Sequence, residues 1–297
     1  MKGVNWRKPA TLLLTVAITA YLLHKVYSEA SRVHLSPSLL LSPHFIGAVG
    51  TGALTYLLYS TLWYVYFGGV TKVSFRRVFL ATLVGTYLSF SLNPAIGTLV
   101  KVRLLGVEYW VMMGVGLLAI ATEFLAGLLI VVVIGRNQIA LLLAGLLVVA
   151  IVFDKIAYYF LYPFFYLVRS LRTLDGLYKG WHEARKDLIL VIIGTCIGIA
   201  LVMMNSLTLV LVGRTLNVWI PFLKAVEGVL YSGFLGGLLG TPGGIGANEL
   251  GLTFAIGDSP TAIVVAFLYK FITQYSYAFV GAIAFYRVVS RELENRR

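Results

Sequence analysis

Several charged residues lie in stretches of sequence that are otherwise apolar, and they are the first candidates for chemistry. Glu123, Glu249 and Lys270 are each flanked by long apolar runs, and Lys101 and Arg103 close another such run. A charged side chain inside a bilayer costs about 2.5–3.5 kcal/mol on insertion scales, so it requires a partner or a function. A carboxylate can bind a cation, whereas ammonium and guanidinium groups can bind a phosphate. We therefore treat these five residues as candidates for ligand binding.

Glu249 lies near the end of a glycine-rich stretch, Gly233–Gly251, which is centred on a proline. Glycine and proline are the least favourable helix residues, so the stretch predicts a helix that is broken and then restarts. In a membrane, broken backbone survives only where protein or a water-filled cavity satisfies its hydrogen bonds. The restarting helix offers free N–H groups, which suit an anionic ligand or a carboxylate. Glu249 can therefore act in function or cap its own helix. We expect a binding site at the break, formed by Pro242, Gly243, Gly244, Gly246 and Glu249.

Lys270 lies in the middle of the last apolar run, too deep for its ammonium group to reach water easily. It either pairs with a buried carboxylate or binds a phosphate. Glu123 and Glu227 are candidate partners, although a local i,i+3 pair of Glu227 with Lys224 is the simpler interpretation. The glycines around the break have small-xxx-small spacing, which also predicts close packing of helices.

The composition predicts a membrane protein with several spans. The chain has 297 residues, of which 59% are hydrophobic and 12% charged, and its mean hydropathy is +0.89. Soluble domains carry about 25% charged residues. The net charge of +12 falls in the short loops between apolar runs, the positive-inside pattern of a membrane protein, so we do not expect nucleic-acid binding. The histidines lack metal-ligand spacing and no nucleophile–base pair stands out, so we predict no metal, no cofactor and no enzymatic activity.

Six apolar runs are long enough to span about 30 Å of hydrocarbon. They cover residues 9–27, 44–68, 109–134, 138–162, 188–213 and 261–286. We interpret the first run as a retained span rather than a cleaved signal peptide. Two further stretches, 78–100 and 222–256, contain breaks at Pro94 and Pro242. If both are re-entrant hairpins, every basic cluster falls on one side, which places both termini in the cytoplasm. The sequence thus predicts an all-α polytopic protein of the cell membrane, with residues 1–297 forming one transmembrane domain.

The two broken stretches resemble each other. A shift of 148 residues places Pro94 on Pro242 and Lys101 on Glu249. With the topology above, the hairpins enter from opposite sides, and such a pseudo-inverted repeat is a known transporter plan. Between the halves, residues 164–187 predict either an amphipathic helix on the cytoplasmic face or a solvated loop. Just before them, Asp154 and Lys155 are expected to pair locally or to reach the interface.

Two motifs resemble the lysylphosphatidylglycerol synthase transmembrane region family, also called flippase-like. The run 241–249, TPGGIGANE, resembles its signature P-G-G-x-G-x-x-E, and Asn93–Gly97 followed by Lys101 resembles its first motif. The order of elements agrees over roughly residues 5–288. The resemblance implies movement of lipids across the bilayer, such as aminoacylated phosphatidylglycerol or polyprenyl-linked lipids. In bifunctional members a separate soluble domain makes the aminoacyl lipid, and we expect this chain to lack that domain.

The sequence therefore predicts a lipid translocase. Hairpins around Pro94 and Pro242 are expected to meet near the midplane and to line a polar cavity. We expect the phosphate of an anionic phospholipid or polyprenyl phosphate to bind there to the basic candidates Lys101, Arg103 and Lys270. Glu123 and Glu249 are expected to balance charge or to contact a cationic headgroup. The alternatives are a membrane enzyme or accessory subunit in lipid synthesis and an ion-coupled transporter of small solutes. Possible partners are a second copy of the chain or a separate lipid-synthesising enzyme.

Overall fold

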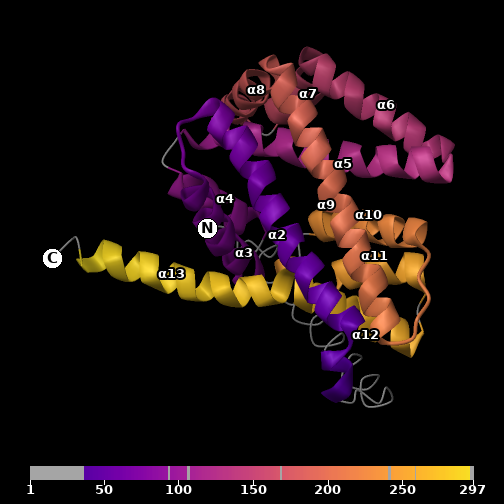
Figure 1. Cartoon of the computed structure of the whole chain (residues 1–297). Helices are drawn as coiled ribbons and strands as arrows, with labels where there is room; N and C mark the ends of the chain where they lie inside the picture. The colour runs from indigo at the N-terminus through magenta and orange to yellow at the C-terminus, as the bar shows by residue number, and fades with distance from the viewer. Residues whose placement is uncertain are drawn as a thin grey trace, which may run out of the picture.

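The computed structural model describes residues 37–92, 94–105, 108–167, 169–239, 242–257 and 259–294. Nearly all of these residues are helical and none of them forms a strand, which confirms the predicted all-α class (Figure 1). The predicted span over 9–27 lies outside the described residues, as does Asn93 of the first motif.

Four helical segments in the described part are long and apolar enough to cross a membrane. They are α2 (Pro43–Val70), α5 (Tyr109–Gly135), α9 (Leu188–Thr215) and the run Pro260–Arg287, which joins α12 (Pro260–Lys270), the π-helical turn η3 (Phe271–Tyr275) and the first part of α13 (Ser276–Glu294). They match four of the six predicted spans. The chain therefore has the helices of a multi-pass membrane protein.

Helices α2 and α9 pack antiparallel along most of their length. Near one end, the Thr208 hydroxyl donates a hydrogen bond of 2.9 Å to the Thr51 hydroxyl. Towards the other end, Gly69 packs on Leu190. Aromatic side chains of α2, among them Trp63, are buried against α5 and form the largest core cluster. The other elements pack on this antiparallel pair of helices.

The straight helix expected over 138–162 is instead two helices, α6 (Gln138–Val152) and α7 (Asp154–Leu167), which meet at 93°. The bend falls at Phe153, whose backbone leaves the helical conformation. Helix α6 alone, with 15 residues, is about 22 Å long, shorter than the hydrocarbon layer. The following stretch is a helix rather than a loop, α8 (Leu171–Lys186), and its buried residues lie against the start of α5.

Both Pro–Gly stretches form antiparallel helical hairpins. In the first, α3 (Phe75–Ser91) packs on α4 (Pro94–Leu104) so closely that a Cβ on Gly97 would collide with the carbonyl oxygen of Gly85. In the second, α10 (Phe222–Leu239) packs on α11 (Ala247–Ile256), and a Cβ on Gly251 would lie 2.5 Å from the Ser232 nitrogen. Around the second break, Gly236 packs closely on Asn248 but a Cβ on Gly237 would meet nothing within 4 Å, so the packing role expected of the glycines there is observed only in part.

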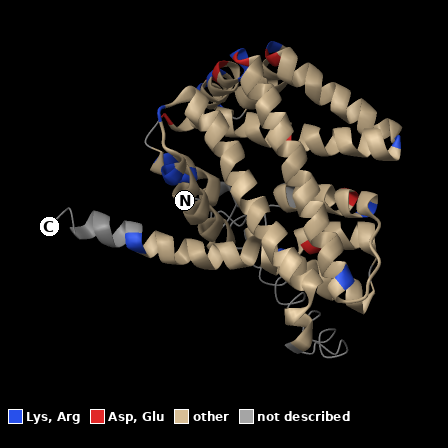
Figure 2. Ribbon diagram, in the orientation of Figure 1, with Lys and Arg blue, Asp and Glu red and all other residues tan. Residues whose placement is uncertain are grey.

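Charged residues are unevenly distributed over the molecule. Figure 2 shows most lysines and arginines gathered near the start of α3, at α4 and over α8. Isolated basic residues lie at the turn between α5 and α6, near α10 and at the end of α9. Most of the helical surface between these regions carries no charge, as expected for a surface that faces lipid.

Candidate functional site

A polar cavity of about 340 Å³ lies where the tips of the two hairpins meet. The first hairpin contributes Ser89 and Phe90 from the end of α3. The second contributes Gly243, Gly244 and Asn248, from the short helical turn η2 (Pro242–Gly244) and the start of α11. The remaining walls come from α2, α5, α9, α10 and η3. The hairpins that the sequence predicts to meet thus do meet, with a hollow between them.

The tip of the second hairpin requires glycine. Gly243, Gly244 and Gly246 have φ angles of 63°, 68° and 91°, a region that side-chain-bearing residues rarely adopt. Gly243 also packs directly on the ring of Phe90, which leaves no room for a side chain. Pro242 opens η2, as Pro94 opens α4. The backbone of the second tip can therefore approach both the first hairpin and the cavity.

Glu249 caps its own helix. Its Oε2 accepts a hydrogen bond of 2.7 Å from the Gly246 backbone N–H, and its Oε1 accepts one from the Tyr275 hydroxyl. The side chain is buried and does not line the cavity. The capping interpretation is the one observed, and Glu249 contributes to the site by fixing the tip of the hairpin against η3.

Glu123 is the one charged residue that lines the cavity. Within the described residues, its carboxylate has no hydrogen bond and no basic group within 4.0 Å. Lys101 lies behind it and interacts with it electrostatically. The Lys101 ammonium sits 3.2 Å from the centre of the Trp63 ring and 3.4 Å from the Tyr59 hydroxyl oxygen, so aromatic faces hold this cation.

The other two basic candidates are also away from the cavity lining. Lys270, at the end of α12, is buried and interacts electrostatically with Glu249, although no carboxylate of the described residues lies within 4.0 Å of it. Arg103 is exposed on α4. The structure thus gathers the glycine tip and Glu123 at one cavity, holds Lys101 behind that cavity, and leaves Arg103 on the surface.

Three amide side chains at the cavity were absent from the predicted site. Asn248 donates hydrogen bonds to the Gly243 carbonyl oxygen at 3.2 Å and to Gln274 Oε1 at 3.4 Å. Asn205 accepts one of 3.0 Å from the Tyr269 hydroxyl. Gln274 lies in the π-helical turn η3, a distortion that is frequent at functional sites. Each of the three is an isolated polar side chain in an apolar run, so the criterion that selected the charged candidates could also have selected them.

An apolar groove of about 890 Å³ runs between α5, α6 and α10. It shares two walls with the polar cavity. On α5, Glu123 lines the cavity and Phe124 lines the groove, while on α10 Gly233 lines the cavity and Phe234 the groove. A Cβ on Gly233 would lie 3.9 Å from the Phe124 ring, which places the seam between the two chambers there.

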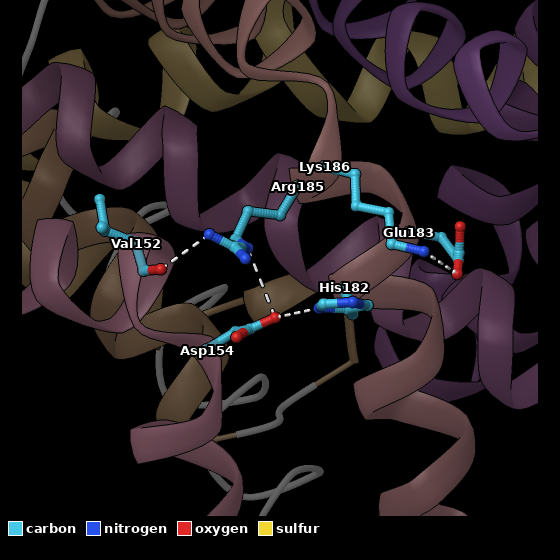
Figure 3. Close-up of polar contacts among 6 residues, drawn as sticks. All are labelled: Val152, Asp154, His182, Glu183, Arg185 and Lys186. Carbon is cyan, nitrogen blue, oxygen red and sulfur yellow. Dashed lines mark hydrogen bonds and ion pairs between the residues drawn. The ribbon is translucent and has the colours of Figure 1, made fainter.

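Two of the remaining charged candidates form ion pairs, Asp154 with residues distant in sequence and Glu227 with a neighbour. Asp154 is buried at the start of α7 and contacts His182 Nδ1 at 2.5 Å and Arg185 Nε at 3.4 Å (Figure 3). Lys224 and Glu227 form an i,i+3 pair at 2.7 Å. No cluster of three or more histidine, cysteine, aspartate or glutamate side chains suited to a metal ion occurs in the part of the chain that the structure describes.

Comparisons of the chain with protein-family models, with curated proteins and with solved structures find no match. The residues that the structure describes form an all-helical protein with four helices long and apolar enough to cross a membrane, or five if the bent pair α6 and α7 counts as one span.

Proposed function

We propose that this protein is a lipid translocase, which moves a lipid headgroup between the leaflets through the polar cavity. The observation that carries the proposal is the shared wall of α5 and α10, with the polar cavity on one side and the apolar groove on the other. A lipid has the same two parts. Its headgroup would enter the cavity while an acyl chain stays in the groove, so that neither part is transferred into an unfavourable environment.

The hairpin lengths support re-entrant loops. Helices α4 and α11, of 11 and 10 residues, are about 15–17 Å long, roughly half of the hydrocarbon thickness. A hairpin with such a short arm enters the bilayer and returns to the same side. Re-entrant loops whose tips meet at a polar cavity are what a path for a headgroup requires, because their broken backbone is satisfied by water and protein.

The element bounds support a pseudo-inverted repeat. Shifting the chain by 148 residues moves the start of α2 to 191 and that of α3 to 223, within three residues of the starts of α9 and α10. Helices α2 and α9 run antiparallel, as halves of inverted topology do. The charge pairs Lys101 with Glu123 and Glu249 with Lys270 occupy corresponding places with opposite sign. Two halves of this kind offer equivalent paths towards each leaflet.

The lining of the cavity favours a particular headgroup chemistry. Hydroxyl, amide and backbone groups and one carboxylate line it beside the apolar side chains of Phe90 and Leu201, and no lysine or arginine takes part. Such a lining binds hydrogen-bond donors such as hydroxyl or ammonium groups. Among the candidate substrates, we therefore favour a phospholipid whose head carries such donors over a bare polyprenyl phosphate. We place the protein in the cell membrane with its basic edge and both termini in the cytoplasm.

A cavity-filling substitution tests the proposal. Gly237 lines the cavity, and a Cβ there meets nothing within 4 Å, so Gly237→Leu places a side chain in the cavity without moving the backbone. In liposomes with fluorescent phosphatidylethanolamine and a membrane-impermeant quencher, we expect about tenfold slower lipid exchange. The leucine side chain would occupy space that the headgroup needs, and a loss of about 1.4 kcal/mol in headgroup binding is a factor of ten. Gly145→Leu on α6, which also enters open space but lies outside both chambers, is the matched control. Equal rates for wild type and Gly237→Leu would contradict the proposal.

A further inference from the structure

Helix α7 presents apolar side chains that no other part of the described chain covers. Asp154 is its only buried residue. Ile156, Phe160, Phe164 and Leu167 recur along one face, and Phe160 and Leu167 are 81% and 79% exposed. Exposed apolar surface of this extent marks contact with a membrane or a partner.

The opposite face of α7 carries hydroxyl groups. Tyr158, Tyr162 and Tyr166 are spaced by four residues, and consecutive rings lie 6.1 and 6.3 Å apart. The Tyr158 hydroxyl donates a 2.8 Å hydrogen bond to Asp175 of α8. Tyrosine is enriched where a bilayer meets water, because its ring is apolar and its hydroxyl needs a polar partner. Helix α7 is thus amphipathic, with aromatic hydroxyls on one side and hydrocarbon on the other.

The 93° bend gives α7 its direction. Helix α6 returns alongside α5, one of the helices able to cross a membrane, after a turn of two residues. If α5 and α6 follow the bilayer normal, α7 lies close to the membrane plane. Pro163 is consistent with this depth, since it leaves the Tyr159 carbonyl without its helical donor. Water can satisfy that carbonyl in the interface, but not in the hydrocarbon core.

Polar contacts of α7 with α8 hold the bend between α6 and α7. Figure 3 shows the Asp154 carboxylate between His182 and Arg185 of α8. Arg185 Nη1 also donates a 2.7 Å hydrogen bond to the carbonyl of Val152, one of the last carbonyls of α6, which lack helical donors. The Tyr178 ring stacks on His182 and packs on Tyr158. These contacts join α7 and α8 into one unit.

The unit formed by α7 and α8 also carries an excess of basic residues. Residues 154–187 carry six lysines or arginines against four aspartates or glutamates. Arg172 and Lys179 line a pocket of about 530 Å³ together with Trp110 and Tyr109 of α5. Lys179 is 3.8 Å from Glu108, and both of these side chains are largely exposed. Glu108 and Asp175 also line this pocket, so its charged side chains balance. The excess of basic residues over 154–187, next to an amphipathic helix, favours the surface of an anionic membrane.

We infer that α7 lies in the water–lipid interface of an anionic bilayer, with its Ile156–Leu167 face in the acyl chains. The exposed basic residues of α8, among them Arg172 and Lys179, then lie at the level of the anionic headgroups. This surface is separate from the polar cavity and does not depend on the proposed transport. The sequence predicted an interfacial segment over residues 164–187. The inferred interfacial segment instead comprises α7 and α8 together.

Depth measurements test the position of α7. Spin labels are placed one at a time at Ile156, Phe160, Phe164 and Leu167, in full-length protein with Cys196→Ser, reconstituted in nanodiscs of phosphatidylcholine and phosphatidylglycerol. Accessibility to oxygen and to a nickel chelate is expected to give one shared depth for all four labels. A spanning helix would instead change depth by about 16 Å from 156 to 167. That progression, or full exposure of the labels to the nickel chelate as for a surface that awaits a soluble partner, would overturn the inference.

Lipid titration tests the contact of Arg172 and Lys179 with anionic headgroups. Native mass spectrometry of the purified protein with added phosphatidylglycerol is expected to show about tenfold weaker binding for the Arg172→Gln, Lys179→Gln double variant. The control is Lys72→Gln, Arg76→Gln, which removes two exposed basic residues at the start of α3. Equal loss in both double variants would show a general charge effect and overturn the assignment to α8.

Discussion

Charged residues within the apolar helices perform different tasks in this protein. Glu249 completes the N-terminus of α11, and Lys101 rests on the ring of Trp63. Glu123 faces the cavity, where no side chain of the described chain bonds its carboxylate. The sequence selects all three for the same reason, because a charged side chain loses favourable hydration in an apolar environment. The environment of each side chain separates the structural residues from the one available to a ligand.

The capping role of Glu249 has a measurable consequence for stability. Glu249→Gln removes the charge that accepts hydrogen bonds from the Gly246 N–H and the Tyr275 hydroxyl. We expect it to lower the free energy of unfolding by about 1–2 kcal/mol, measured by thermal unfolding in detergent. Glu227→Gln, which disrupts only a partly exposed local pair with Lys224, is expected to cost about 0.2–0.5 kcal/mol. A Glu249 effect no larger than that of Glu227 would contradict the capping role.

At the scale of elements, the two hairpins depend on backbone contact between their arms. Gly85 with Gly97 in the first, and Gly251 with Ser232 in the second, let helices approach without side chains between them. Such contacts replace the hydrophobic effect as the driving force of packing inside a membrane. In each hairpin, the same Pro–Gly stretch therefore breaks the helix at the tip and lets the two helices pack closely.

Alanine at a contact glycine tests this packing. Gly251→Ala puts a Cβ 2.5 Å from the Ser232 backbone nitrogen, so α10 and α11 must separate. We expect a loss of about 1–3 kcal/mol in the free energy of unfolding. Gly145→Ala, where a Cβ meets nothing within 4 Å, is expected to be neutral or to stabilise its helix by up to about 1 kcal/mol. Similar melting of both variants would show that the arms are not held by this contact.

At the scale of the whole molecule, charge and helix direction define two sides. The basic residues near α3, α4 and α8 gather at one edge, and the turn between α5 and α6 lies far from it (Figure 2). The apolar belt between the two edges is what a bilayer would cover. In the proposed topology, both ends of each hairpin lie on one side of the bilayer, and the two hairpins open to opposite sides.

Labelling from one side of a membrane tests this topology. In protein with Cys196→Ser, single cysteines at Ser74 and Glu108 flank the first hairpin, and those at Asn137 and Asn217 lie at far turns. With an impermeant maleimide added to oriented vesicles, we expect Ser74 and Glu108 to react together, and Asn137 and Asn217 to react together from the opposite side. Labelling of Ser74 and Glu108 from opposite sides would mean that the first hairpin crosses the bilayer, and the re-entrant proposal would fail.

Much of the architecture was predictable because it depends on local properties. Apolar runs of more than twenty residues predict α2, α5 and α9, and glycine and proline predict the breaks beside Pro94 and Pro242. The bend at Phe153 was not predictable in this way, since no glycine or proline lies next to it. The bend is held by contacts of Asp154 with His182 and Arg185, which are far from Asp154 in sequence.

The sequence alone determined that the chain is helical, suited to a membrane and broken at two points, because hydrophobicity and backbone preference act over a few neighbouring residues. Which charged side chains reach the cavity depends instead on the tertiary structure. Lys101 turns to Trp63, Arg103 to the surface and Glu123 to the cavity, according to how each helix is rotated against its neighbours. That rotation results from packing between distant segments, which no local pattern of residues records.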